Sequence, residues 1–165
     1  MQDGEFGLGK NKTFEVFQTL VENFSNFQLV AIAGINQKMK ELFANFVAEK
    51  KCEKNVKVLE YTNKVPELMS ISDVVVTKPG GLTSTESLVS GLPMIIINPI
   101  PGQEEQNATF LEKNGAAVWL KNNDNIKEIL NNILNYPEKL MEMKKNALYL
   151  AKPHSTKSIC DILLK

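Results

Sequence analysis

The stretch from residue 73 to residue 107 limits the possible folds more than any other part of this sequence. It contains, in order, a short apolar run, a Gly-Gly turn, a hydroxyl-rich helix start, a second apolar run and a Pro/Gly loop. These segments are residues 74–76, 80–81, 83–86, 94–97 and 98–107. An open parallel sheet presents a ligand site in this order, at the carboxyl ends of its strands. The stretch therefore predicts an α/β fold with a binding site at one sheet edge.

The rest of the chain continues the alternation of strands and helices. Apolar runs predict further strands at residues 27–33, 56–59 and 116–120. Helical periodicity or helix-start signals predict helices at residues 13–24, 38–50, 65–71 and 105–113, and from residue 125 to the end with breaks at residues 136–137 and 153. Five strands that alternate with helices indicate a parallel sheet with right-handed crossovers.

The amino-terminal residues 1–12 are rich in glycine, with Gly4, Gly7 and Gly9. We expect a loop there that leads into the first helix, because backbone N–H groups of such a loop can hold an anion. The spacing is not that of a dinucleotide-binding glycine motif. A phosphate loop of this kind normally follows a strand, so we expect the chain to be a fragment that begins just after its first strand.

Composition narrows the chemistry of any bound anion. The chain has 19 basic and 19 acidic residues, which gives no reason to expect nucleic acid or a membrane surface as a partner of the isolated chain. All basic residues are lysines, so a phosphate must be held by backbone N–H groups, hydroxyls or lysine.

The spacing of Cys52 and Cys160 fits two reduced thiols. No apolar run reaches the roughly 20 residues of a membrane span, and no signal peptide is evident, so a cytoplasmic location is expected.

The helix that starts near Thr83 has two possible roles. Its free N–H groups, with the hydroxyls of Thr83, Ser84 and Thr85, could hold a diphosphate without arginine. Alternatively, Thr83 is only a helix cap, and Glu86 is its partner in a capping box.

Polar side chains further along the stretch suit a sugar. Glu86 could accept hydrogen bonds from a ribose diol, and Gln103, Glu104 and Asn107 could recognise sugar hydroxyls. The competing interpretation of the last three is a solvated helix start. His154, the only histidine, lies far from this stretch, and no catalytic triad or metal-ligand spacing is evident.

A set of ordered motifs connects the chain to a known family. The set is the run from Asp73 to Glu86, then Gly91-Leu-Pro, Pro101-Gly-Gln-Glu, Asn107 and Asn114-Gly-Ala. It resembles the carboxyl-terminal half of family 28 glycosyltransferases, most of all the processive diacylglycerol glucosyltransferases of bacteria and the monogalactosyldiacylglycerol synthases of plants. The peptidoglycan branch of the family has an Arg-Ser pair where this chain has Lys78-Pro79, which favours the glycolipid branch.

The resemblance implies roles for individual residues. The backbone of Thr62 would pair with uracil, and Glu86 would hold the ribose hydroxyls. The diphosphate would lie against Gly80, Gly81, Leu82 and Thr83, joined by the loop with Gly7 and Gly9. Gln103 and Glu104 would contact the transferred sugar, with Asn107 beside them.

The resemblance also implies a fold and a reaction. The fold is the Rossmann-like carboxyl-terminal half of a GT-B glycosyltransferase, with helices on both sheet faces and its first strand missing or truncated. Residues 1–165 would be a single donor-binding domain, and the acceptor-binding domain that precedes it in the family is absent from this chain. The full-length enzyme would be an inverting transferase that moves a hexose from UDP-glucose or UDP-galactose to a membrane lipid such as diacylglycerol, without a metal cofactor.

We expect the isolated domain to be inactive. The full-length protein would be cytoplasmic and would reach the inner face of the plasma membrane as a peripheral protein. Two alternatives stay open: a stand-alone UDP-sugar-binding subunit of a split transferase, and half of a UDP-sugar 2-epimerase.

Overall fold

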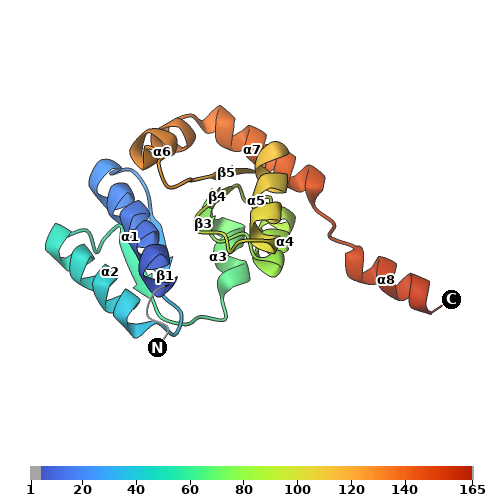
Figure 1. Ribbon diagram of the computed structural model, residues 1–165, viewed down its shortest axis with the longest axis horizontal. Coiled ribbons are helices and arrows are strands. Elements are labelled where there is room, and N and C mark those ends of the chain that lie inside the picture. Colours follow the sequence, from blue (N-terminus) through green and yellow to red (C-terminus); the bar gives the residue numbers. More distant parts are fainter. Residues whose placement is uncertain (1–4, 165) are drawn as a thin grey trace. The chain divides into compact units, whose positions relative to one another are not determined.

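The computed structural model describes residues 5–164. Helices and short strands alternate up to residue 119, and only helices follow in the described part of the chain (Figure 1). The strands are β1 (Leu29–Ile32), β2 (Val56–Leu59), β3 (Val75–Thr77), β4 (Met94–Ile96) and β5 (Ala117–Trp119). The helices are α1 (Glu5–Asn23), α2 (Gln37–Lys50), α3 (Val65–Ile71), α4 (Gly81–Val89), α5 (Gln103–Lys113), α6 (Ile126–Leu134), α7 (Pro137–Leu150) and α8 (Ser155–Leu163).

The chain forms two compact units. The first comprises residues 5–65 together with Asn123–Asn132. The second comprises Pro66–Asn122 together with residues 133–164. The first unit therefore contains β1 and β2, and the second contains β3, β4 and β5.

An aromatic cluster forms the core of the first unit. β1 and β2 pair in parallel, with Leu29 opposite Val56. The rings of Phe17 on α1 and Phe43 on α2 stack with centroids 4.3 Å apart, and both side chains are buried together with Val56. Such aromatic packing adds to the free energy of apolar burial. The two helices are thereby fixed against one face of the β1–β2 pair.

Helix α2 is capped at its start and forms an ion pair with α1 at its other end. The Asn36 side chain accepts a hydrogen bond from the Met39 N–H at 3.1 Å, which satisfies one of the free donors at the start of α2. At the other end of α2, Lys50 pairs with Glu22 of α1 at 2.8 Å. This contact lowers the pKa of Glu22 and raises the pKa of Lys50.

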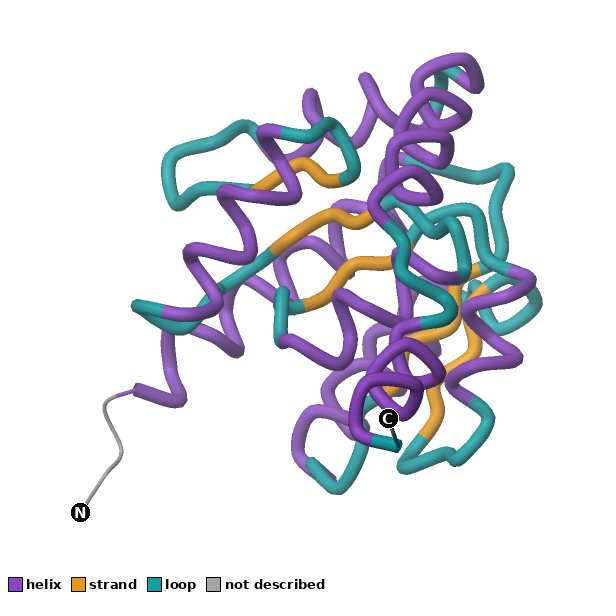
Figure 2. Tube along the Cα trace, turned by 90° about the vertical axis from the view of Figure 1, so that its right-hand side faces the viewer, coloured by secondary structure: helices purple, strands orange, loops and turns teal. Residues whose placement is uncertain are grey.

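The second unit is built around the central strand of a parallel sheet with the order β3-β4-β5. All residues of β4 are buried, as expected of a strand that is covered on both faces. Met94 and Ile96 pack with Ala108 and Leu111 of α5 and with Ala147 of α7. Helices α4 and α5 connect the successive strands, and Figure 2 shows helices (purple) alongside the strands (orange).

Two glycines in the second unit occupy positions that a larger residue would disturb. Gly91 and Gly115 have φ angles of 60° and 67°. A Cβ at Gly91 would lie 2.9 Å from Leu148 Cγ, and a Cβ at Gly115 would lie 2.7 Å from Asn146 Nδ2. The Asn146 amide donates a hydrogen bond to the Gly115 carbonyl at 3.2 Å. These glycines let the chain turn closely beneath α7 before β4 and β5 begin.

The predicted α/β class with parallel strands is confirmed. The bounds of β2 and α3 agree with the prediction, and the other strands lie within their predicted ranges or one residue away. One difference is in the pairing: within residues 5–164 the strands are hydrogen-bonded as a two-stranded and a three-stranded sheet. The apolar pattern predicts where strands lie, but contacts between residues far apart in the sequence determine which strands pair.

The predicted amino-terminal loop is wrong from Glu5 onward. Residues 1–4, which include Gly4, lie outside the described residues, and α1 already begins at Glu5. Gly7 and Gly9 therefore lie within a helix. Glycine costs about 1 kcal/mol in a helix interior. The buried Val16 and Phe17 further along α1 stabilise the helix against that cost.

Candidate functional site

The carboxyl ends of β3 and β4 lie at one edge of the three-stranded sheet. Thr77 is opposite Ile96, and the Ile97 N–H donates to the Thr77 carbonyl at 3.1 Å. Asn98 follows β4 in the left-handed conformation, with φ 44°. Asparagine tolerates this conformation better than most residues, and it turns the chain into the loop before α5. The strand edge is therefore next to the first turns of α4 and α5.

Helix α4 presents unpaired backbone donors at this edge. Its cap is Gly80, and its first backbone hydrogen bond runs from the Ser84 N–H to the Gly80 carbonyl at 2.9 Å. The N–H groups of Gly81, Leu82 and Thr83 precede that bond and have no acceptor within the helix. Gly80 contributes no side-chain cap. The positive end of the helix dipole and these donors together favour an anion.

The space beside these donors is open. A Cβ added to Gly81 would meet no atom within 4 Å, and the φ angle of Gly81 lies outside the left-handed range. The Leu82 side chain is 82% exposed. The conformation of α4 therefore does not require glycine at Gly81, whereas close approach of a ligand to the backbone would.

The hydroxyl side chains of α4 differ from one another. Thr85 Oγ1 donates to the Gly81 carbonyl at 2.9 Å, and Ser84 is buried with no hydrogen-bond partner for its hydroxyl in the described part of the chain. Thr83 is half-buried, and its hydroxyl has no partner among the described residues. Of the three hydroxyls expected to hold a phosphate, only that of Thr83 is both accessible and uncommitted.

The predicted capping box at Thr83 is wrong. Helix α4 begins at Gly81, two residues earlier than expected, so Thr83 lies inside the first turn. Glu86 is exposed, and across residues 5–164 its carboxylate forms no hydrogen bond or ion pair. The Gly80-Gly81 pair caps and begins the helix, so it does not form a separate turn before a helix that starts at Thr83.

The side chains at the start of α5 are partly occupied by the preceding loop. Glu104 Oε2 accepts a hydrogen bond from the Ile100 N–H at 2.7 Å, and a Cβ on Gly80 would lie 3.7 Å from Glu104 Oε1. Glu105 Oε2 accepts from the Gly102 N–H at 3.4 Å. Gln103 is exposed. Gln103 and Glu104 thus stand beside the first turn of α4, and only Gln103 has its whole side chain available.

Asn107 joins α5 to the turn before α4. Its Nδ2 donates to the Pro79 carbonyl at 2.9 Å, and the Asn107 side chain is half-buried. Sequence reasoning missed this contact, because the two residues are 28 positions apart and no local pattern relates them.

The remaining predicted site residues belong to the first unit. Thr62 follows β2, and its hydroxyl accepts a hydrogen bond from the Lys64 N–H at 3.1 Å. The backbone N–H and carbonyl of Thr62 form no hydrogen bond within residues 5–164. Gly7 lies in the first turn of α1, where N–H groups lack a helical acceptor, and Gly9 lies past that turn, where its N–H points along the helix.

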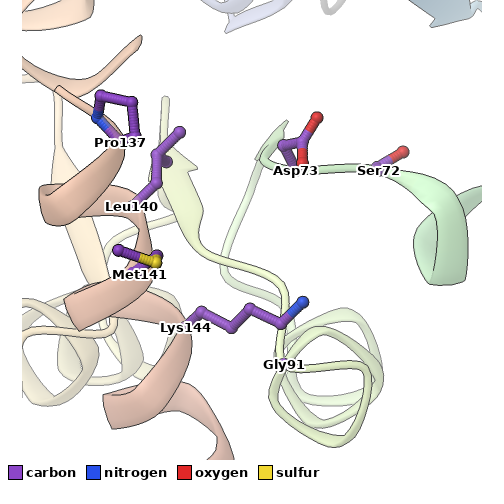
Figure 3. Close-up of a pocket in the computed structure, with 7 residues that line it drawn as sticks. All are labelled: Ser72, Asp73, Gly91, Pro137, Leu140, Met141 and Lys144. Carbon is purple, nitrogen blue, oxygen red and sulfur yellow. The ribbon is translucent and has the colours of Figure 1, made fainter. Parts of the chain in front are cut away.

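A shallow hollow lies at the opposite end of the three-stranded sheet. It is lined by Ser72 and Asp73 before β3, by Gly91 before β4 and by residues of α7, and Figure 3 shows the side chains of Asp73 and Lys144 on opposite sides of it. Its volume is about 230 Å³. Because it adjoins the amino ends of the strands, the hollow is separate from the edge that carries the predicted site.

Residues 5–164 hold no group of three or more His, Cys, Asp or Glu side chains that could bind a metal ion. In the same part of the chain, every helix is too short or too polar to cross a bilayer.

Known structures identify the class of this fold. The crystal structure of Acinetobacter baumannii MurG is similar with a TM-score of 0.72 at 23% identity, over 96% of this chain and 46% of MurG. The crystal structure of Anabaena Alr3699/HepE in complex with UDP and glucose is similar with a TM-score of 0.66 at 17% identity, over 87% of this chain and 40% of that one. The fold is that of GT-B glycosyltransferases.

The sequence then places the chain within that class. Residues 9–148 match the family described as glycosyl transferases group 1, and the chain belongs to this family. It is 36% identical over 162 residues to the processive diacylglycerol beta-glucosyltransferase of Bacillus pumilus. The aligned region covers 98% of this chain and 41% of that protein. The predicted resemblance to diacylglycerol glucosyltransferases is confirmed. The chain thus spans less than half the length of this relative.

Proposed function

We propose that this chain is the donor-binding part of an inverting glycosyltransferase that moves a hexose from a UDP-sugar to a membrane lipid such as diacylglycerol. The relative from Bacillus pumilus is named for diacylglycerol as acceptor and glucose as the transferred sugar. Its name favours a transferase over a UDP-sugar epimerase. The acceptor-binding part would correspond to the portion of the relatives that lies outside the match with this chain.

The amino end of α4 is the observation that carries the proposal. It combines the acceptor-free N–H groups of Gly81, Leu82 and Thr83 with open space beside Gly81. Donors fixed in a helix need no rearrangement to meet a negatively charged oxygen. A chain without arginine can therefore bind the diphosphate of a UDP-sugar through its backbone.

Glu86 and Thr62 are the proposed contacts to the nucleoside. The Glu86 carboxylate, one turn after the diphosphate donors, can accept hydrogen bonds from both ribose hydroxyls. The uncommitted backbone N–H and carbonyl of Thr62 match the alternating donor and acceptor groups on the edge of uracil. Within the first unit, Gly7 lies in the first turn of α1, where its N–H has no helical acceptor, whereas the helical position of Gly9 leaves its N–H a less suitable donor.

The transferred hexose would contact the start of α5. Gln103 offers an amide that both donates and accepts, as sugar hydroxyls require. Glu104 has Oε2 committed to the Ile100 N–H, so Oε1, which faces Gly80, is its available acceptor. These contacts suit either UDP-glucose or UDP-galactose.

The proposed reaction transfers one bond. The acceptor hydroxyl oxygen attacks the anomeric carbon, and the bond from that carbon to the diphosphate oxygen breaks with both electrons passing to UDP. The hydroxyl proton passes to a base, which we assign to the part of the full-length protein outside this chain. The α4 donors stabilise the charge that develops on the leaving diphosphate, in place of a metal cofactor.

Calorimetric titration of the 165-residue chain with UDP and UDP-glucose tests the proposal. We expect both ligands to bind, and no heat of binding at millimolar UDP would contradict the proposal. Addition of EDTA should leave the affinity unchanged. Glu142→Ala, which removes an exposed carboxylate on α7, is the control and should bind UDP like the wild type.

A further inference from the structure

Asn107 contacts the protein in a way that separates it from the sugar-binding side chains beside it. The Pro79 carbonyl can only accept a hydrogen bond, so the Asn107 amide must present its NH₂ group to it. One of the two N–H donors of this group is thereby committed to the protein and is not available to a sugar hydroxyl. The contact therefore assigns Asn107 a different task from Gln103.

The carbonyl that receives this hydrogen bond has a special position. Pro79 is fully buried, and it directly precedes Gly80, the cap of α4. A buried carbonyl without a partner is costly, and α4 itself supplies none, because the helix begins with the Gly80 carbonyl. The peptide between Pro79 and Gly80 is therefore oriented by a side chain that comes from α5.

We infer that Asn107 is a positioning residue for the backbone N–H groups that would hold the diphosphate. Its amide fixes the Pro79–Gly80 peptide, and this peptide sets the direction in which the N–H groups of Gly81, Leu82 and Thr83 point. The inference rests on the proposed function, because it names what holds the proposed diphosphate site in place.

Asn146 provides a matched control. It is also half-buried, and its amide also donates to the backbone carbonyl of a residue far away in the sequence, Gly115, at 3.2 Å. Gly115 precedes β5, so this hydrogen bond lies at the opposite edge of the same sheet. The two amides share chemistry and burial, and they differ in that only the Asn107 amide contacts the turn before α4.

The variants Asn107→Asp and Asn146→Asp replace each amide with a carboxylate of the same shape that has no donor at neutral pH. For Asn107→Asp we expect the affinity for UDP to fall about tenfold or more, as one charge-assisted contact is lost. The affinity for uridine, which has no phosphate, should stay within twofold. Asn146→Asp should change neither affinity. Asn107→Ala removes the amide without adding a charge, and it replaces Asn107→Asp if that variant does not fold.

Amide hydrogen exchange provides a readout that needs no ligand. The Ser84 N–H closes the first turn of α4 on the Gly80 carbonyl. It should exchange faster in Asn107→Asp than in the wild type, and at the wild-type rate in Asn146→Asp. Equal Ser84 exchange in all three proteins, or an equal loss of UDP and uridine affinity in Asn107→Asp, would overturn the inference.

The two proposals fail in different ways. If the wild type does not bind UDP, the proposed function fails and the positioning role fails with it, whatever the exchange rates are. If the wild type binds UDP and Asn107→Asp binds it equally well, only the positioning role fails.

Discussion

Substitution of Gly81 by alanine should raise the stability of the folded chain and at the same time weaken its binding of UDP. Gly81 is the first residue of α4, its φ angle is not left-handed, and an added Cβ would meet no atom within 4 Å. A glycine-to-alanine change at such a position stabilises the folded state by about 0.4–1 kcal/mol, because the unfolded chain loses conformational freedom. For a domain of this size the corresponding rise in Tm is about 1–4 °C.

The same substitution should lower the affinity for UDP. A phosphate oxygen bound to the α4 donors would lie about 2.9 Å from an amide nitrogen, so the new methyl group would occupy space within van der Waals contact of the ligand. Loss of one charge-assisted hydrogen bond costs about 1.5–3 kcal/mol, which is roughly a 10- to 100-fold weaker affinity. Uridine affinity should change little, because uridine does not reach this turn.

Thermal denaturation and calorimetric titration of the same preparation measure both effects. Gly91→Ala is the matched control: it forces alanine to a φ angle of 60° and within 2.9 Å of Leu148, at the other end of α4, so Tm should fall while UDP affinity of the folded protein is kept. The reasoning is refuted if Gly81→Ala is more stable and binds UDP as tightly as the wild type. A fall in Tm for Gly81→Ala would refute the assignment of open space.

Three further outcomes are expected. Glu86→Ala should weaken UDP binding by about 1–3 kcal/mol by calorimetry and leave Tm unchanged, since Glu86 caps nothing; a lower Tm would return Glu86 to a structural role. Gly115→Ala should lower stability by at least about 1 kcal/mol in urea denaturation, because alanine at φ 67° is strained and its Cβ would displace the Asn146 amide; equal stability would contradict the observed turn. The Glu22–Lys50 pair should make stability depend on pH: the lowered pKa of Glu22 means that its contribution is present above the ordinary value of 4.5 and is lost as the pH falls through the folded value, and this dependence should be weaker in Glu22→Gln.

Local sequence signals located most elements of the fold. The apolar runs at β2 and β4 and the proline in the first turn of α3 depend only on neighbouring residues, so the pattern was sufficient there. The start of α4 was misplaced by two residues because Gly80 and Gly81 looked like a turn, although they cap and begin the helix. Helix ends are decided by small energy differences that a pattern of residues does not resolve.

The candidate site was only partly predictable for the same reason. Thr83 and Glu86 were predicted because hydroxyl and carboxylate residues follow a glycine pair, and their roles stay predictions. The commitment of Thr85 to the Gly81 carbonyl and of Glu104 to the Ile100 N–H depends on side-chain directions that appear only in three dimensions. The prediction of a loop at Gly7 and Gly9 was wrong, because glycine frequency alone does not distinguish a loop from a helix that is stabilised by packing further along.

The donors at the start of α4 belong to the main chain, and this affects how substitutions at the site act. Alanine substitution at Leu82 or Thr83 removes a side chain but leaves the backbone amide in place, so it would not reveal the contribution of that amide. Substitutions that add bulk or that replace an amide by proline are the ones that impair such a site. Sequence drift at the exposed Leu82 side chain would leave the amides intact, so the site can tolerate variation in side chains while losing function to a single added methyl group.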